Sequence, residues 1–257
     1  MNTRDLAALA HELATARADA RVLSIAPWRE SVRSMDDAYA VQSELAKLPG
    51  NAVRGWKVTA LTPEQQRGFS SNRPVAGALF ASHVHQAPTT LTLSKFIATV
   101  IECEISFRLS RDLPERSTSY TDAEIADAID AIVPCYEFPD NRVPVDAPDL
   151  LKLADDMGNG AFVAGEPVTD WRKLDLSQID IVLRHDGKEI TRGPAARILG
   201  NPLKAVTALA HAQPLPADGL KAGQIVTTGT CTTPLPLQRG EYVADFGVLG
   251  TVRLSVL

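Results

Sequence analysis

The sequence has few cysteines and no excess of basic residues. Its three cysteines, Cys103, Cys135 and Cys231, are far apart and form no Cys-x-x-Cys pair. This argues against a disulfide framework or a zinc knuckle and favours a reducing compartment. With 31 acidic against 26 basic residues the net charge is −5, whereas a nucleic-acid surface needs a basic excess. We therefore expect no nucleic-acid partner.

A long apolar run is also missing. The longest stretch without charge, residues 74–94, contains two prolines and two histidines, so it is not expected to span a bilayer. The first twenty residues carry Asp5, Glu12 and Asp19 and no apolar segment, unlike a transit or secretion signal. We expect a cytoplasmic protein with no membrane partner.

Several motifs of well-known enzyme sites are absent or incomplete. There is no Gly-x-Ser-x-Gly nucleophile elbow and no Gly-Lys-Ser phosphate loop, and Gly158-x-Gly160 lacks the strand before it and the helix after it that a dinucleotide loop needs. His83-x-His85 has no third ligand nearby, so a polar strand or loop explains it better than zinc binding.

Helical patterns dominate the first fifty residues. Apolar residues recur at helical spacing over residues 6–13, and a second helix begins at Ser34 and stops at Pro49-Gly50. Further helices are predicted to begin at Thr62, Thr121 and Asn201. The helix from Thr121 is predicted to continue through Ile132 until Pro134 ends it.

The rest of the chain has the pattern of short strands and turns. Strands are predicted over residues 53–59, 101–109, 135–138, 161–164, 179–184, 189–192, 224–228, 242–246 and 251–256. This order predicts an α+β fold, with an N-terminal helical segment and a mixed, rolled or barrel-like sheet. We divide the chain into a mostly helical segment, residues 1–75, which packs on a catalytic β-roll domain, residues 76–257.

One predicted strand carries two glutamates on the same face. Residues 101–109 alternate strictly between apolar and polar side chains. In a strand, Glu102 and Glu104 would therefore lie about 7 Å apart at their roots, close enough to converge on one ion. Taken alone, such a pair is better explained as the solvated face of a half-buried strand.

A third glutamate, Glu137, changes that balance. It follows Val133-Pro134-Cys135-Tyr136 in an otherwise apolar strand, where an unpaired carboxylate is costly to bury. No lysine or arginine follows until Arg142, so Glu137 needs a cation. Three carboxylates without an imidazole form a hard-oxygen site that suits Mg²⁺ or Mn²⁺.

Such a site predicts the class of substrate. Mg²⁺ prefers six oxygen ligands, so three carboxylates leave three positions open. A small 2-oxo acid can fill two of them with a carboxylate oxygen and its keto oxygen, and the metal would stabilise the enolate.

A series of short motifs occurs in one order along the chain. They are Gly55-Trp56-Lys57-Val58; Gly77-Ala78-Leu79-Phe80; Glu102-Cys103-Glu104 with Arg111-Asp112-Leu113-Pro114; Val133-Pro134-Cys135-Tyr136-Glu137 with Arg142; Ala154-Asp155 leading to Gly160; Leu199-Gly200-Asn201-Pro202-Leu203; and Gly223-Gln224-Ile225-Val226 with Thr228-Gly229. From Gly55 to Val252 the chain resembles the hydratase/decarboxylase branch of the fumarylacetoacetate hydrolase superfamily, typified by 2-oxopent-4-enoate hydratase.

The resemblance implies a mixed, rolled β-fold, homo-oligomers and association with pathway enzymes. It also implies metal ligands, catalytic groups and a substrate pocket, namely Glu102, Glu104 and Glu137; Lys57 and Asp155; and Leu79, Phe80, Arg142 and Thr228. Without the resemblance, Lys57 would be taken as a surface charge and Asp155 as the exposed end of a helix. Partial burial of Lys57 beside the metal is expected to lower its pKa towards the range of a proton shuttle.

The sequence departs from the family pattern around the expected substrate pocket. Lys57 is followed by Val58-Thr59-Ala60-Leu61 instead of Ile-Gly-Leu-Thr, and Pro74-Val75-Ala76 precedes Gly77 where an acidic or aromatic residue is frequent. We expect a hydratase of a 2-hydroxy-dienoate or 2-oxo-enoate. The alternatives are a decarboxylase of 2-oxohex-3-enedioate, an acylpyruvate hydrolase, for which no suitable histidine is found, and a non-catalytic partner subunit.

Overall fold

The computed structural model describes residues 3–257, so Met1 and Asn2 of the predicted helical segment lie outside the described residues. None of the helices in this range is long and apolar enough to cross a membrane. The α-helices are α1 (Thr3–Ala18), α2 (Met35–Ala46), α3 (Pro63–Arg67), α4 (Asp122–Asp127), α5 (Asp149–Ala154) and α6 (Leu203–His211).

The strands form two mixed sheets. The large sheet has the order β2-β1-β10-β5-β6-β7-β3, with β11 beside β5. Its strands are β1 (Val53–Thr59), β2 (Val75–Phe80), β3 (Val84–Gln86), β5 (Val100–Leu109), β6 (Ile129–Pro139), β7 (Asn159–Ala164), β10 (Ile225–Thr230) and β11 (Leu235–Pro236). The small sheet has the order β4-β13-β12-β8-β9 and consists of β4 (Thr89–Leu91), β8 (Asp180–His185), β9 (Lys188–Pro194), β12 (Gly240–Asp245) and β13 (Thr251–Val256).

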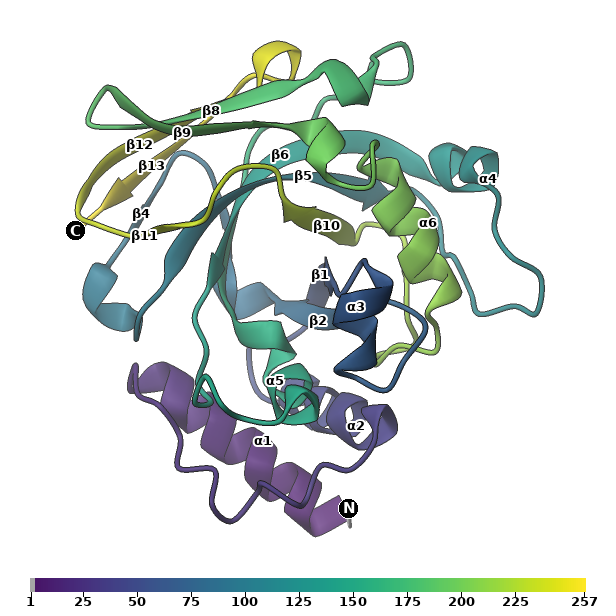
Figure 1. Cartoon of the computed structure of the whole chain (residues 1–257), viewed down its shortest axis with the longest axis vertical. Coiled ribbons are helices and arrows are strands. Elements are labelled where there is room, and N and C mark those ends of the chain that lie inside the picture. The colour runs from purple at the N-terminus through teal and green to yellow at the C-terminus, as the bar shows by residue number, and fades with distance from the viewer. Residues whose placement is uncertain (1–2) are drawn as a thin grey trace.

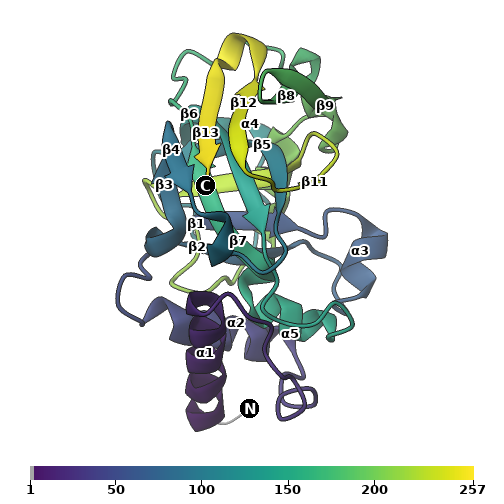
Figure 2. The same ribbon diagram turned by 90° about the vertical axis from the view of Figure 1, so that its left-hand side faces the viewer.

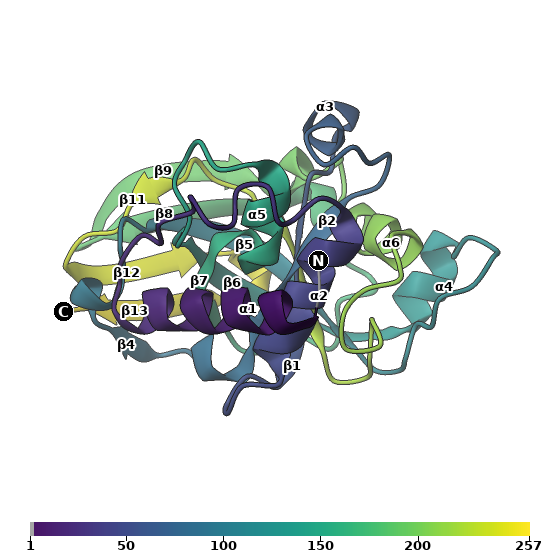
Figure 3. The same ribbon diagram turned by 90° about the horizontal axis from the view of Figure 1, so that it is seen from below.

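The large sheet curls around one concave face (Figure 1). Helices α1, α2 and α5 lie at one end of the molecule, and the small sheet lies at the other end (Figures 1 and 2). Seen from below, α1 lies across α2 (Figure 3). The predicted α+β fold with a rolled sheet is therefore confirmed. Within residues 3–257 neither sheet closes into a barrel, because their paths end at β2 and β3 and at β4 and β9.

The predicted helix starts are confirmed by their capping contacts. Ser34 accepts a hydrogen bond from the Asp37 N–H at the start of α2. Thr62 and Thr121 form complete capping boxes with Gln65 and Glu124. Each cap satisfies N–H groups that the first turn of a helix leaves unpaired.

The helix predicted between Thr121 and Pro134 is wrong in its second half. Helix α4 ends at Asp127, and β6 begins at Ile129. Ile132 and Val133 are β-branched, and β6 pairs with β5 along this stretch. Pairing within the sheet therefore outweighs the helical spacing of the apolar residues.

The outer edge of β2 is covered by helix α2 instead of by another strand. The fully buried Gln42 donates to the carbonyls of Ala76 (3.1 Å) and Leu153 (2.7 Å) and accepts from the Ala78 N–H (3.1 Å). The Tyr39 hydroxyl accepts from the Ala76 N–H. These side chains satisfy backbone groups that a sheet edge leaves unpaired.

The division of the chain at residue 75 remains a prediction. Strand β1 lies within the predicted helical segment and pairs with β10 and β2 in the large sheet. Buried residues from α1 to β13 belong to one continuous apolar core. The N-terminal helices therefore share their core with the sheet.

We expect Gln42→Leu to lower the free energy of unfolding by about 2–4 kcal/mol, because three buried backbone groups lose their partner. Urea unfolding followed by circular dichroism measures the change. The matched control is Gln178→Leu, since Gln178 is exposed. A loss no larger than that of the control would show that Gln42 does not hold the edge of β2.

Candidate metal centre and active site

Three glutamates come together through the register of β5 and β6. Glu102 and Glu104 lie on one face of β5, and Glu137 of β6 is directly opposite Glu102. Residues directly opposite each other in an antiparallel pair project to the same face, with Cβ atoms about 5 Å apart. Carboxylate oxygens from all three residues lie within 4.8 Å of one another. We call these residues the glutamate cluster.

The glutamate cluster is largely shielded from water. Glu137 is 0% and Glu104 1% exposed, and Glu102 is partly buried. Buried carboxylates at this separation repel one another and need a compensating cation. All their donor atoms are carboxylate oxygens, the ligands that hard divalent cations prefer. The residues present therefore fit a divalent metal ion.

Burial and mutual repulsion change the acidity of the glutamate cluster. Burial, together with the charges of Glu137 and Glu104, raises the pKa of Glu102 to about 9. Burial and the charge of Glu137 raise the pKa of Glu104 to about 7, although hydrogen bonds from Thr227 and Gly229 favour its ionised form. Binding of a divalent cation must therefore displace protons.

Polar groups to which the sequence analysis gave no role orient two of the glutamates. The Thr227 hydroxyl donates to Glu104 Oε2, and the Gly229 N–H donates to the same atom at 3.0 Å. Asn159 Nδ2 donates to Glu137 Oε1 at 2.8 Å. The available signal for Asn159 is a polar residue that opens an apolar strand.

Lys57 reaches the glutamate cluster from β1. Its Nζ lies 2.8 Å from Glu137 Oε2 and 3.4 Å from the Met157 carbonyl oxygen. Strands β10 and β5 separate β1 from β6, and three strand spacings in a flat sheet would amount to about 14 Å. The contact therefore depends on the curl of the sheet (Figure 1).

The carboxylates hold Lys57 in its protonated form. Burial alone would lower the pKa of Lys57, but the charges of the three glutamates and the hydrogen bond to Glu137 together outweigh burial, and the net shift is upward. The lowered pKa expected from the sequence is therefore not found in the chain alone. The physical reason is that the lysine sits among carboxylates, which favour the charged ammonium.

A cavity of about 360 Å³ opens beside the glutamate cluster. Its lining includes Lys57, Glu102 and Glu104 from the sheet, Gln65 from α3 and Arg197 from a short 3₁₀ helix, Ala195–Arg197. Arg197 is exposed, and no described residue hydrogen-bonds or ion-pairs with it. The cavity thus contains a second cation in addition to Lys57.

Four residues predicted to bind substrate do not line this cavity. Leu79 belongs to a small apolar cluster, and Phe80 and Arg142 line a different cavity. The Thr228 hydroxyl donates to the Ile105 carbonyl at 2.6 Å. The role of these four residues in substrate binding remains a prediction.

Asp155 and Arg142 form a buried ion pair. Arg142 donates from Nε to Asp155 Oδ1 (2.8 Å) and from its backbone N–H to Oδ2 (2.9 Å), and both side chains are 1% exposed. The other guanidinium N–H groups donate to the carbonyls of Asp140, Asn159 and Asp155. The pair thus fixes the turn that leads to Asn159. The proton-transfer role of Asp155 remains a prediction.

Comparison with known proteins identifies the family. The family described as "Fumarylacetoacetate (FAA) hydrolase C-terminal" matches residues 68–257. A 2-keto-4-pentenoate hydratase of Burkholderia vietnamiensis is 32% identical over 257 residues, which cover 97% of each chain. A 2-oxo-hept-4-ene-1,7-dioate hydratase of Escherichia coli is 28% identical over 85% of each chain. The chain belongs to the fumarylacetoacetate hydrolase family.

A solved structure shows the same fold over the whole length. It is 4-oxalocrotonate decarboxylase from Pseudomonas putida G7, complexed with magnesium and adipate. The two structures superimpose with a TM-score of 0.88 at 23% identity, and the match covers 100% of this chain and 99% of that chain. The family predicted from the motifs is thus confirmed, together with its fold.

We expect the affinity of the metal-free protein for Mg²⁺ to rise with pH. A divalent cation held by the glutamate cluster would have to displace protons from Glu104 and Glu102, whose pKa values are about 7 and about 9. Because both values are raised, the folded chain holds these protons tightly at low pH and releases them as the pH increases. At a pH between these two pKa values, binding displaces one proton, so the affinity should rise about tenfold per pH unit. Isothermal titration calorimetry in buffers of different ionisation enthalpy measures the affinity and the released protons.

Two variants serve as controls for this pH dependence. Glu102→Gln removes the group of highest pKa and should flatten the increase above neutral pH. Glu166→Gln changes an exposed residue and should leave the increase intact. An affinity that does not change with pH would contradict the prediction.

Proposed function

We propose that the chain is a divalent-metal-dependent lyase, a hydratase that adds water to a 2-hydroxy-dienoate or 2-oxo-enoate. The observation that carries this proposal is the glutamate cluster, which has Lys57 at its side and a cavity in front of it. The names of the relatives support the same reaction, because both are hydratases of 2-oxo acids.

The chain's own residues would hold and orient the metal. Glu102, Glu104 and Glu137 would be the ligands, and Thr227, Gly229 and Asn159 keep two of them in place. Mg²⁺ or Mn²⁺, when bound there, would supply Lewis acidity at the 2-oxygen, where negative charge develops.

Lys57 is the group positioned to move a proton. Its Nζ carries a proton at the wall of the cavity, 2.8 Å from Glu137. With a divalent cation at the glutamate cluster, the carboxylates would favour the ammonium less, so the pKa of Lys57 would fall towards that of a useful general acid. The lysine would then donate its Nζ proton to a carbon of the substrate and would regain a proton from the water that adds to the conjugated carbon.

A decarboxylase of a 2-oxo-enedioate is the second candidate. Arg197 lines the cavity and has no partner among the described residues. Its guanidinium would suit a substrate with a second carboxylate. Hydratase and decarboxylase would share the glutamate cluster, so the residues around it do not distinguish the two reactions.

The remaining alternatives have less support. A hydrolase would need a histidine-assisted base, and no histidine is among the residues lining the cavity beside the glutamate cluster. A non-catalytic partner subunit has no physical need for three clustered carboxylates. We extend the proposal to a homo-oligomer in the cytoplasm that acts on a small 2-oxo acid and can associate with a pathway enzyme.

The assay uses EDTA-stripped protein with 2-hydroxypenta-2,4-dienoate and with 2-oxohex-3-enedioate, each with and without Mg²⁺. We expect Mg²⁺-dependent loss of the dienol absorbance without release of carbon dioxide, because the glutamate cluster is proposed to hold the metal. Glu104→Gln should abolish the reaction, and Glu166→Gln should retain it. Release of carbon dioxide from the diacid would favour the decarboxylase, and no turnover of either substrate despite metal binding would overturn both assignments.

Lys57→Met should lower kcat by a factor of about 10² to 10⁴, the usual contribution of a positioned general acid. Its affinity for Mg²⁺ should stay the same or increase, because a cation beside Glu137 is removed. The exposed Lys188 provides the matched control, Lys188→Met. Steady-state kinetics and calorimetry on both variants make the comparison, and an unchanged kcat in Lys57→Met would exclude the proposed role.

A further inference from the structure

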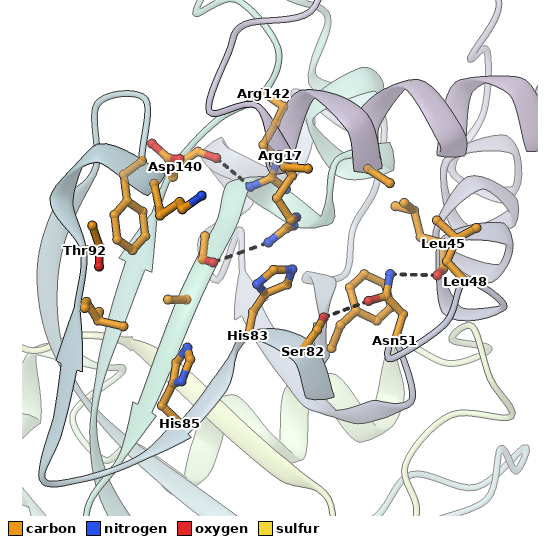
Figure 4. Close-up of a pocket in the computed structure, with 18 of the residues that line it drawn as sticks. Arg17, Leu45, Leu48, Asn51, Ser82, His83, His85, Thr92, Asp140 and Arg142 are labelled. Carbon is orange, nitrogen blue, oxygen red and sulfur yellow. Dashed lines mark hydrogen bonds between the residues drawn. The ribbon is translucent and has the colours of Figure 1, made fainter.

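We propose that a second cavity, distinct from the one beside the glutamate cluster, binds a small molecule with a carboxylate and an apolar body. This cavity of about 630 Å³ lies between α1, α2 and the strands β2, β3 and β7 (Figure 4). We call it the helix-side cavity. It shares no lining residue with the cavity beside the glutamate cluster, so its occupant would not be the substrate in its reacting position.

The size and walls of the helix-side cavity are those of a small-molecule site. Leu45 and Leu48 line it from the side of α2, and Phe80, Leu91 and Phe96 line it from the strands and their connections. Ligand pockets in proteins commonly have volumes of about 300–1,000 Å³ and apolar walls with a few convergent polar groups. The apolar residues would contact the body of the ligand.

Several of the polar groups that line the helix-side cavity are hydrogen-bond donors. Arg17 makes only long contacts, 3.4 Å to the Gly160 carbonyl and 3.3 Å to Asp156, so it keeps further N–H groups available. The ring of His83 lies next to Arg17 (Figure 4). The side chains of His83 and His85 have no hydrogen-bond or ion-pair partner among the described residues.

The charges around the helix-side cavity favour an anion. Burial, followed by the charges of Arg17 and Arg142, lowers the pKa of His83 to about 3, so His83 is a neutral group that can donate one hydrogen bond. Lys95 is exposed at the cavity and has no ion pair with a described residue. Lys95 is thus an unpaired cation at the cavity, and Arg17, which is paired with Asp156, still has N–H groups that can donate.

The acidic residue that lines the helix-side cavity is already engaged. Asp140 accepts hydrogen bonds from the backbone N–H groups of Ile97 and Ala98. Arg142 is paired with Asp155. A carboxylate, which only accepts hydrogen bonds, therefore complements the donors that remain, and Arg17 can hold it by charge-assisted bonds.

A short segment joins the helix-side cavity to the glutamate cluster. Arg17 pairs with Asp156, and the next residue, Met157, offers its carbonyl oxygen to Lys57. Asn159 donates to Glu137. Asp156 and Met157 both have left-handed backbones, with φ of 52° and 53°, a conformation that surrounding contacts must maintain. A change in the contacts of Arg17 can therefore reach Lys57 and Glu137 through this segment.

The test measures binding of 2-naphthoate and of its neutral analogue 2-naphthamide to the full chain by calorimetry. The metal-free protein is used, and also Glu104→Gln, so that chelation at the glutamate cluster does not contribute. We expect one naphthoate per chain in both proteins, with at least tenfold weaker binding of the amide. Arg17→Gln should weaken binding of the acid at least tenfold, whereas Arg21→Gln, at an exposed residue paired with Asp19, should leave it unchanged.

The variants His83→Leu and Lys95→Gln test the ligand contacts without removing a contact of the fold, because neither side chain has a partner within residues 3–257. Each should weaken binding of naphthoate while the unfolding midpoint in urea stays the same. The proposal is overturned if the native chain does not bind naphthoate, if acid and amide bind equally, or if the variants of Arg17, His83 and Lys95 all bind like the native chain. Failure of the hydratase assay would leave these outcomes unaffected.

Discussion

The repulsion between three clustered carboxylates, two of them buried, is the constraint on which the rest of the site depends. Without compensation, Glu102, Glu104 and Glu137 could not share one face of an apolar sheet. Lys57 supplies one positive charge, neighbouring donors orient two of the carboxylates, and raised pKa values keep part of the charge neutralised by protons. The same arrangement leaves the cluster prepared for a divalent cation, so the electrostatic cost of the cluster and its capacity to bind metal have one origin.

The curl of the large sheet brings Lys57 close to the glutamate cluster. Lys57 contacts Glu137 although two strands lie between theirs. The backbone also packs closely at Gly55 and Gly77, and the lack of a side chain at these two glycines permits this packing. A Cβ on Gly55 would collide with the Ile225 carbonyl of β10, and one on Gly77 would collide with the Asp156 carbonyl. These collisions give a physical reason for both glycines in the motifs of the sequence.

Local sequence patterns predicted the parts of the fold and site that depend on neighbouring residues. Alternation placed Glu102 and Glu104 on one face, and three helix caps were found from single residues. Lys57 was predicted to be a catalytic group only because of the family resemblance. Strand β2 was missed because Val75-Ala76-Gly77-Ala78 does not alternate. Thr227 was missed because its contact with Glu104 depends on pairing between β10 and β5, which are distant in the chain. For Asn159 the sequence offers only the weak signal of a polar residue at the start of an apolar strand, and its contact with Glu137 depends on the pairing of β6 with β7.

The side chains that cover the edge of β2 have a consequence for the behaviour of the whole molecule. An open sheet edge presents a row of unpaired N–H and C=O groups and can recruit a strand from another chain. Here Gln42 and Tyr39 occupy the backbone groups of Ala76 and Ala78, so these groups cannot pair with an added strand. Helix α2, which lies outside the matched family region of residues 68–257, thus shields this edge of the sheet from pairing with a strand of another chain.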